Sequence, residues 1–355
     1  MGRDGDLRRQ PREWLAASAA VRGRSHAVAG GPCQDAASVA RAPGALSVCV
    51  CDGAGSAALS HHGAQFVARE VAEYLTSVAE PYVSGEIPAA AVVTRAREGV
   101  DQLVRNHGGS SRDYACALMG LVIAHDKVAA VHIGDGVIAE VVAGHPRVLS
   151  GPDNGEFANV TTFITSTDAL ERVRVVTKGL GPANTSFALM TDGAATALYE
   201  GRTRNVSQVV EQVASWLDDR TEEEVAAALA TALREHLVPK THDDCTLAVV
   251  RRHAPLLFAC PSCKRWDLVR VGHGVRRFRV GCRACGEETC QAGGSRGRPP
   301  IARQWVLHLA LVAGEGVREI SATTRIPIRT IRRWLRLAVR DCRSGGATPR
   351  QEDHR

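Results

Sequence analysis

Short apolar runs and longer stretches of helical spacing alternate along the chain. The short runs are typical of buried strands, and they occupy residues 46–51, 118–124, 127–133, 137–142, 187–191 and 246–250. Apolar side chains recur every three or four positions in the longer stretches, which predicts amphipathic helices at residues 60–78, 88–106, 206–217 and 222–237. Clusters of strands separated by pairs of helices favour antiparallel sheets covered by helices over an alternating βαβ array.

Acidic residues stand at the ends of three of these runs. Asp52 follows residues 46–51, Asp192 follows residues 187–191, and Asp243 and Asp244 precede residues 246–250. Carboxylates and exposed backbone carbonyls are the oxygen ligands that hard divalent cations prefer. The pattern therefore predicts a divalent-cation site built from strand ends.

Five acidic motifs together resemble the metal-dependent PP2C (PPM-type) protein phosphatases over residues 20 to 250. Each motif alone is a common turn sequence, but their order matches the family: Gln34-Asp35, Asp52-Gly53-Ala54-Gly55, Gly134-Asp135-Gly136, Thr191-Asp192-Gly193 and Asp243-Asp244-Cys245-Thr246. The resemblance implies an α+β fold, an α/β/β/α sandwich of two mainly antiparallel sheets flanked by helices. It also implies hydrolysis of phosphoserine or phosphothreonine in protein substrates.

The resemblance assigns roles to individual residues. Asp52 is expected to bridge two Mn²⁺ or Mg²⁺ ions, and Gly53 to offer its carbonyl to one of them. Asp192 and Asp243 are expected to hold the other ion, and Asp35 to support the first through water. Two such ions lower the pKa of a bridging water, so a hydroxide can attack phosphorus without a covalent phosphoenzyme.

Asp113 and Asp135 are less clearly assigned. Asp113 precedes a predicted strand, where many family members place an acid for a third and looser metal ion. An ordinary acidic residue there is the equal alternative. Asp135 matches a motif that is mainly structural in the family, so it is left out of the metal ligands.

The chain departs from the family before its first motif. An arginine that typically clamps the substrate phosphate is expected four residues before Gln34, where the chain has Gly30. Losing a guanidinium removes a bidentate phosphate contact. His26 or Arg24 are candidate replacements, and the Ser25-His26 opening is similar to that of a bacterial subgroup. Metal binding is accordingly a firmer expectation than efficient catalysis.

Charge divides the 355-residue chain into two parts. Residues 251–355 contain 22 Lys and Arg against 8 Asp and Glu, a net charge of +14, whereas residues 1–250 have 22 against 30, a net charge of −8. A strongly basic part is expected to face a polyanion such as DNA. The start of the chain is charged and lacks an apolar signal segment, and no apolar run could span a bilayer. We therefore expect a cytoplasmic protein with no membrane partner.

A four-cysteine zinc site is expected in the basic part. Two C-x-x-C pairs, separated by eighteen residues, fit a tetrahedral structural zinc ion: Cys260, Cys263, Cys282 and Cys285. The intervening arms at residues 266–271 and 275–280 predict a hairpin, which resembles the zinc ribbons that precede some DNA-binding domains. A solvated surface around the zinc, or a protein-docking platform, is the alternative.

Residues 316–339 resemble a helix-turn-helix. A short helix at residues 317–323, a turn at residues 325–327 and a second helix from residue 328 are expected to present polar side chains to duplex DNA: Arg329, Thr330, Arg332, Arg333 and Arg336. A basic helical hairpin that docks on protein is the competing interpretation. No feature of the sequence sets the oligomeric state or a DNA sequence preference.

These signals predict a chain of successive parts. They are a polar lead-in, a PP2C-like domain, a zinc ribbon, a linker, a helix-turn-helix and a disordered tail, at residues 1–20, 21–252, 256–292, 293–300, 301–342 and 343–355. The expected function is a metal-dependent phosphoprotein phosphatase with a DNA-binding module. The rival is a DNA-binding regulator whose phosphatase-like domain senses without turnover.

Overall fold

The computed structural model divides the chain into two compact units, residues 12–253, and residues 1–11 with 254–355. The described residues are 14–142, 144–152, 161–180, 185–218 and 220–252, the backbone of three short strands at 268–271, 279–282 and 288–290, and residues 317–318 and 328–334. Among them, no helix is both long enough and apolar enough to cross a bilayer.

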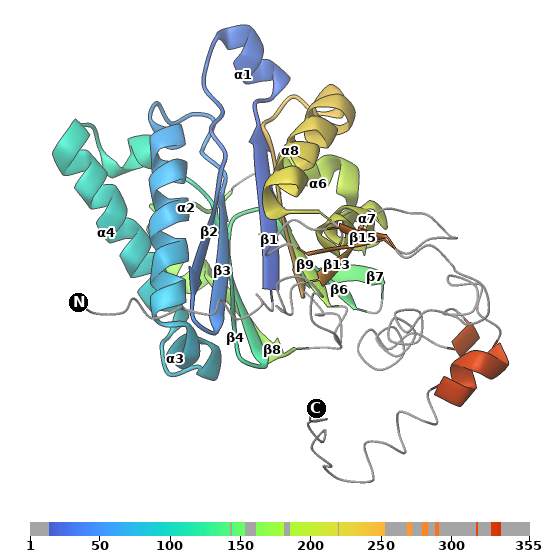
Figure 1. Ribbon diagram of the computed structural model, residues 1–355. Helices are drawn as coiled ribbons and strands as arrows, with labels where there is room; N and C mark the ends of the chain where they lie inside the picture. The colour runs from blue at the N-terminus through green and yellow to red at the C-terminus, as the bar shows by residue number, and fades with distance from the viewer. Residues whose placement is uncertain are drawn as a thin grey trace, which may run out of the picture. The chain divides into compact units, whose positions relative to one another are not determined.

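Two five-stranded antiparallel sheets form the centre of residues 12–253 (Figure 1). The first sheet has the order β1-β12-β9-β6-β7, with strands Trp14–Val21, Cys245–Arg252, Ser186–Met190, Val137–Val142 and His145–Ser150. The second has the order β2-β3-β4-β5-β8, with strands Ala36–Ala42, Ala45–Cys51, Leu118–Ala124, Lys127–Ile133 and Arg174–Gly179. The predicted α+β class with two antiparallel sheets is thus confirmed.

Helices cover the outer face of each sheet, as Figure 1 shows. The second sheet packs against α2, α3 and α4, which span Ser60–Ser77, Ala79–Ser84 and Ala89–His107. The first sheet packs against α6, α7 and α8, which span Asp192–Leu198, Val209–Ala214 and Glu222–Ala232. Smaller elements are α1 (Arg24–Ala29), η1 (Ser111–Tyr114), α5 (Ala169–Arg172), η2 (Ser215–Asp218), η3 (Leu233–Leu237), η4 (Val238–Lys240), β10 (Tyr199–Glu200) and β11 (Asn205–Val206).

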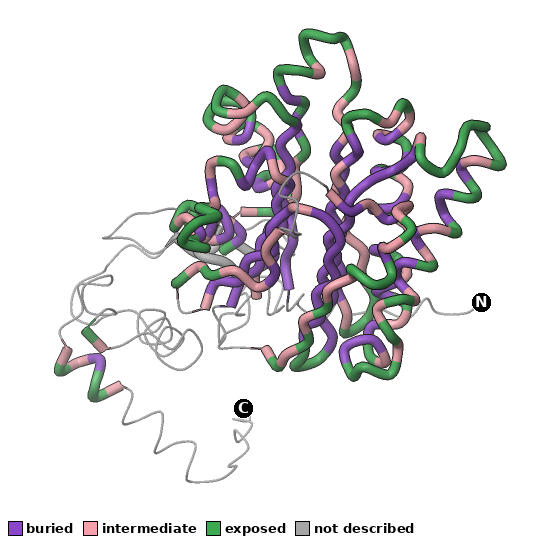
Figure 2. The backbone as a smooth tube through the Cα atoms, turned by 180° about the vertical axis from the view of Figure 1, so that it is seen from behind, coloured by how far each residue is buried: buried purple, intermediate pink, exposed green. Residues whose placement is uncertain are grey.

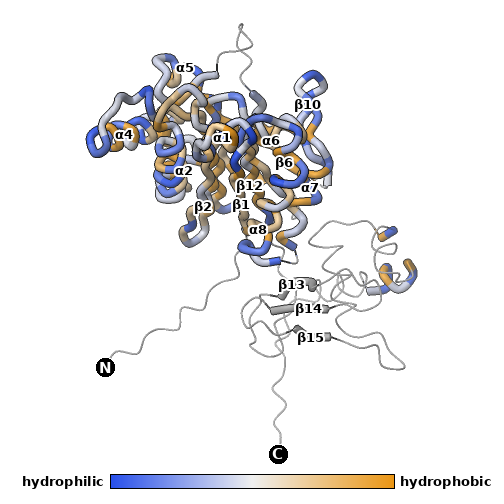
Figure 3. The backbone as a smooth tube through the Cα atoms, turned by 90° about the horizontal axis from the view of Figure 1, so that it is seen from above, coloured by the Kyte–Doolittle hydropathy of each residue, from blue (hydrophilic) through white to orange (hydrophobic). Residues whose placement is uncertain are grey.

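Aliphatic side chains fill three layers of core, one under each helical layer and one between the sheets. Figure 2 shows the buried positions following the strands, and Figure 3 shows hydrophobic residues concentrated there as well. Trp14 and Phe187 are the aromatic residues of the middle layer, with ring centroids 6.1 Å apart. Burial on both faces explains why the central strands appear in the sequence as continuous apolar runs.

Strand β1 corrects one expectation. Trp14–Val21 was assigned mostly to a polar lead-in, yet it pairs with β12 along its whole length, from Trp14 opposite Arg252 to Val21 opposite Cys245. Its sequence, WLAASAAV, is rich in alanine, which has low strand propensity. Pairing with β12, and not local preference, makes this segment a strand.

Part of the basic C-terminal region is described by its backbone. Strands β13 (Leu268–Val271), β14 (Arg279–Cys282) and β15 (Glu288–Cys290) form an antiparallel sheet, with Leu268 opposite Cys282. Residues 328–334 are helical. Most of the predicted zinc ribbon and helix-turn-helix lies outside the described residues.

Candidate active site

Acidic residues from both sheets meet at one end of the sandwich. Val21 and Met190 end β1 and β9 at the level where β12 begins, because they pair with Cys245 and Leu247. In the other sheet, β2 begins where β3 ends, with Ala36 opposite Cys51. The same end therefore gathers five acidic positions, Asp35, Asp52, Asp135, Asp192 and Asp243.

A hydrogen bond between the sheets fixes this end of the sandwich. Thr191, after β9, donates from Oγ1 to Oδ2 of Asp35, before β2, at 2.8 Å. The same Oγ1 accepts the backbone N–H of Thr246 at 3.0 Å. Asp35 and Thr191 are both buried. A buried polar network thus holds the two sheets together at the end where the acidic residues lie.

Burial and mutual repulsion act on these carboxyl groups. Burial, and then the charges of Asp35 and Asp192, raise the pKa of Asp52 well above its usual range. Burial raises the pKa of Asp35 to about 8, although the hydrogen bond from Thr191 opposes the shift. Burial, and then the charge of Asp243, raise the pKa of Asp192 to about 6. An added cation would relieve this repulsion.

At three glycines near the acidic residues, neighbouring backbone segments lie too close to leave room for a side chain. A Cβ on Gly53 would lie 2.6 Å from the carbonyl oxygen of Gln34, and one on Gly193 would lie 2.0 Å from that of Asp244. A Cβ on Gly23 would lie 2.2 Å from the carbonyl oxygen of Asp243. Gly53 and Gly193 of the acidic motifs, and Gly23 after β1, are therefore required by packing between neighbouring loops, whereas a Cβ on Gly55 would meet nothing.

Asp244 has a structural role that its sequence motif did not predict. Its side chain is buried, whereas its neighbour Asp243 is exposed. Asp244 accepts the backbone N–H of Gly23 at 2.6 Å and that of Gln34 at 2.5 Å. It thereby ties together the segments after β1, before β2 and before β12. The tandem Asp243-Asp244 pair was the only signal for it.

Asp113 and Asp135 already have hydrogen-bond partners. Oδ2 of Asp113 accepts the backbone N–H of Ser110 at 2.7 Å and its hydroxyl at 2.9 Å, which caps η1. These bonds lower the pKa of Asp113. Asp135 accepts the hydroxyl of Thr161 at 2.6 Å, and its charge acts on Asp52 and Asp192.

The acidic positions do not form a closed ligand set. In the part of the chain that the structure describes, no three His, Cys, Asp or Glu side chains are arranged to hold one metal ion. One buried oxygen at the site, Oδ1 of Asp192, has no hydrogen-bond partner. An unpartnered carboxylate oxygen among other carboxylates fits a cation ligand, so the donor chemistry suits Mn²⁺ or Mg²⁺.

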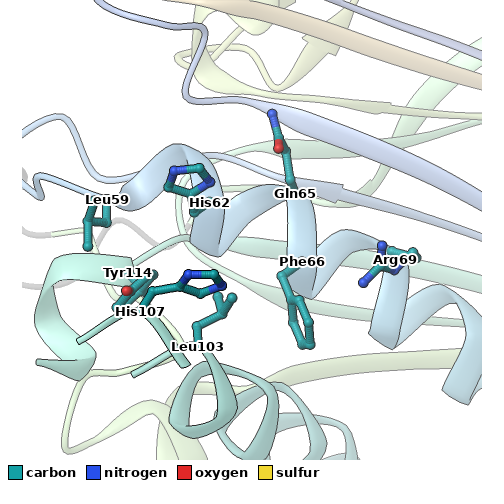
Figure 4. A pocket seen from close by; sticks show the side chains of 8 residues that line it. All are labelled: Leu59, His62, Gln65, Phe66, Arg69, Leu103, His107 and Tyr114. Carbon is teal, nitrogen blue, oxygen red and sulfur yellow. The ribbon is translucent and has the colours of Figure 1, made fainter. Parts of the chain in front are cut away.

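A separate pocket lies between α2 and α4 (Figure 4). It has a volume of about 260 Å³ and is lined by Leu59, His62, Gln65, Phe66, Arg69, Leu103, His107 and Tyr114. None of the five acidic positions lines it. The pocket therefore adds nothing to the candidate metal site.

The predicted zinc and DNA residues are described only in part. Cys260, Cys263, Cys285 and Arg336 lie outside the described residues, and only the backbone of Cys282 is described. Within helical residues 328–334, Ile331 is buried and Thr330 is half-buried. The other predicted DNA contacts in this segment are exposed, namely Arg329, Arg332 and Arg333.

Comparison with known proteins places residues 12–253 in a family. The family model described as Protein phosphatase 2C matches residues 22–234. Serine/threonine-protein phosphatase 3 of Escherichia coli K12 is 34% identical over 188 residues, covering 51% of this chain and 73% of the relative. The solved S. agalactiae serine/threonine phosphatase shares the fold at 14% identity, with a TM-score of 0.50 over 67% of this chain and 99% of that one. The chain therefore belongs to the protein phosphatase 2C family and is a phosphatase of this metal-dependent PP2C type.

Proposed function

We propose that the chain hydrolyses phosphoserine and phosphothreonine in proteins with the help of two Mn²⁺ or Mg²⁺ ions. The observation that carries the proposal is the meeting of buried and half-buried carboxylates from both sheets at one end of the sandwich. No Lys or Arg of the described residues forms an ion pair with Asp35, Asp52 or Asp192. Bound metal cations would therefore compensate the negative charge of these carboxylates.

Each acidic residue has a role in this proposal. Asp52 would be a ligand of both ions, and the carbonyl of Gly53 would add a ligand to one of them. Asp192, with its unpartnered Oδ1, and the exposed Asp243 would hold the other ion. Asp35, fixed by Thr191, would support the first ion through water. Asp113 is a third-ion ligand only if it leaves the η1 cap.

The bound ions would supply a water that ionises near neutral pH and positive charge for the phosphoryl oxygens. The chain itself holds the two sheet ends at a fixed separation through the hydrogen bond between Thr191 and Asp35. The Ser/Thr class of substrate is supported by the name of the E. coli relative.

One assay tests the enzyme proposal. The full chain should hydrolyse p-nitrophenyl phosphate and a phosphothreonine peptide only with Mn²⁺ or Mg²⁺ present. Asp192→Asn should abolish turnover, while Asp168→Asn, an exposed acid paired with Arg172, should not. Calorimetric Mn²⁺ binding without any turnover would instead favour the rival, a DNA-binding regulator with a sensing domain.

We further propose that the basic region binds one structural Zn²⁺ and double-stranded DNA. Pairing of Leu268 with Cys282 brings the hairpin arms together, as a zinc ribbon requires. Exposure of Arg329, Arg332 and Arg333 on helical residues 328–334 supports contact with phosphate and base edges. The zinc ligands would be Cys260, Cys263, Cys282 and Cys285.

Zinc content and DNA retention test this second proposal separately. One zinc per chain is expected by elemental analysis, with loss in Cys282→Ser but not in Cys290→Ser. Retention of duplex DNA in a gel shift should weaken in Arg333→Ala, and the salt slope should fall by about 1 for each lost phosphate contact. Arg69→Ala, which removes the same charge from α2, is the control. Indifference of the wild type to DNA at low salt would refute the DNA proposal.

A further inference from the structure

Polar contacts hold helix α1 at the acidic end of the sandwich. Helix α1 has no buried residue, so apolar packing does not place it. Ser25 donates its backbone N–H to the carbonyl of His242 at 3.0 Å, and Arg24 donates from Nε to the carbonyl of Thr241 at 3.0 Å. Figures 1 and 3 show α1 above the end of the sandwich, between the two helical layers. The helix is thus bound to the turn that leads into Asp243 and Asp244.

The side chains of His26 and Asp244 lie close together within this arrangement. Nδ1 of His26 lies 3.0 Å from Oδ2 of Asp244, at the distance of an ion pair but without the geometry of a linear hydrogen bond. Asp244 is itself immobilised by the backbone N–H groups of Gly23 and Gln34. The carboxylate can therefore orient the imidazole ring, as second-shell carboxylates do for other histidines.

The second nitrogen of His26 faces no protein partner. Nδ1 is buried, whereas Nε2 makes no hydrogen bond to any described residue and is not enclosed. The side chain as a whole is 20% exposed. A fixed ring with one nitrogen on a carboxylate and the other free is positioned to bind a further acceptor at Nε2.

We propose that His26, oriented by Asp244, binds the phosphoryl group of the substrate through Nε2–H; the inference rests on the proposed phosphatase function. When a phosphate dianion approaches, negative charge lies on both sides of the ring. The imidazolium form, which carries an N–H on each nitrogen, satisfies Asp244 and the phosphate together. His26 is then a substrate-binding residue, and Asp244 is its positioning residue.

The conformation of Gly30 agrees with this assignment. Gly30 ends α1 with a backbone φ of +71°, in the left-handed region. Residues other than glycine rarely adopt this conformation. The expected clamping arginine is thus replaced by a helix-terminating glycine. Two residues of the same short helix remain as candidates for the contact to phosphate: Arg24, whose Nε is bound to the carbonyl of Thr241, and His26.

The test compares variants of the full chain with Mn²⁺ and p-nitrophenyl phosphate. His26→Ala should raise KM about 10-fold or more and lower kcat/KM by about 10- to 100-fold, the range of a charge-assisted hydrogen bond. His26→Arg should recover most of the loss. Val28→Ala, on the same helix and 90% exposed, should leave both constants unchanged. Melting temperatures check that all variants fold.

Asp244→Asn tests the positioning role. It should raise KM as His26→Ala does, and the double variant should be little worse than either single variant, because the two residues act on one contact. It should also lower the melting temperature, since one oxygen able to accept Gly23 or Gln34 is replaced by an N–H₂ group. Additive effects on KM would overturn the pairing.

Phosphate binding separates this inference from the proposed function. Calorimetric binding of inorganic phosphate to the Mn²⁺-loaded chain should weaken about 10-fold or more in His26→Ala and not in Val28→Ala. Unchanged KM and unchanged phosphate affinity in His26→Ala would overturn the role of His26, as would a loss confined to kcat. A wild type that binds phosphate without turnover would refute the enzyme proposal alone.

Discussion

Residues 12–253 bury acidic side chains in two different ways. Glu140 lies on β6, is 4% exposed, and receives Nε of Arg147 at 2.7 Å and Nζ of Lys178 at 2.5 Å. Asp35 is 5% exposed, but the charges around it belong to Asp244 and Asp192. One carboxylate has a cation on each oxygen, whereas the other has a hydroxyl and two further acids.

The difference separates a stabilising site from a candidate binding site. A buried charge with complete partners fixes neighbouring strands, here β6, β7 and β8, and leaves no capacity for a ligand. Carboxylates that repel one another reduce the stability of the ligand-free fold, and they persist where a ligand compensates. Glu140 and Asp35 are both carboxylic acids, so the groups that surround each side chain, and not the residue type, decide between stabilisation and ligand binding.

The largest expected effect comes from neutralising one acid in each region. Asp52→Asn should reduce Mn²⁺-dependent kcat by more than about 100-fold, because even outer-shell partners of a metal contribute about 10- to 100-fold. Glu140→Gln should change kcat by less than twofold. The kcat of each variant is measured with p-nitrophenyl phosphate at saturating Mn²⁺. Comparable losses in the two variants would remove the functional distinction.

Stability should show the opposite order. Glu140→Gln should lower the free energy of unfolding by about 1.5–3 kcal/mol, the range for a hydrogen bond to a charged group, because Arg147 and Lys178 lose their common acceptor. The lower end is expected, since Arg147 is 61% exposed and water can replace part of the contact. Urea titration of the full chain with chelator measures the change, with Glu171→Gln on α5 as a surface control.

Without bound metal ions, the stability of the fold should decrease as pH rises, because of the acidic residues at this end. Without cations, Asp35 with a pKa of about 8 and Asp192 with a pKa of about 6 keep protons that the unfolded chain has already released near pH 4. The native state then binds more protons, so stability falls as pH rises from about 4 to 8. The melting temperature in EDTA should drop by a few degrees between pH 6 and 8.

Asp192→Asn provides the matched variant for this effect. It removes one charge from the cluster, so its melting temperature in EDTA at pH 8 should exceed that of the wild type. Added Mn²⁺ should stabilise the wild type more than the variant. A wild type whose stability in EDTA is flat across this range would contradict the repulsion inferred at the site.

The smallest expected effect concerns His132, which is buried on β5 and contacts Oγ of Ser150 through Nδ1 at 2.9 Å. Burial, and then the charge of Arg174, lower its pKa well below 6.5. Below pH 6.5 the unfolded chain therefore binds a proton that the native state does not, and stability falls by at most about 1.4 kcal/mol per pH unit. His132→Asn should flatten the decrease in melting temperature between pH 6.5 and 5.

Much of the fold was predictable from hydrophobic spacing. Residues 60–78 and 88–106 were predicted as helices and became α2 and α4, within one residue at each end. Residues 118–124 and 127–133 were also predicted as strands, and they became β4 and β5 with the same bounds. These elements have strong periodicity because one face of each helix, or both faces of each strand, is buried.

Two elements near the acidic site could not be predicted in this way. Trp14–Val21 is a strand only because β12 lies beside it. Arg24–Ala29 buries none of its residues, and its position depends on hydrogen bonds to residues more than two hundred positions later. Contacts between distant segments leave no local periodic signal.

The sequence by itself determined which acids follow or precede strands, and it thereby predicted a cation site built from strand ends. Only the tertiary structure distinguished Asp243 from Asp244, which are chemically identical neighbours. Asp243 is exposed, whereas Asp244 is buried against Gly23, Gln34 and His26. The surroundings of each carboxylate depend on segments over two hundred residues away, and these come together only when β1, β2 and β12 do.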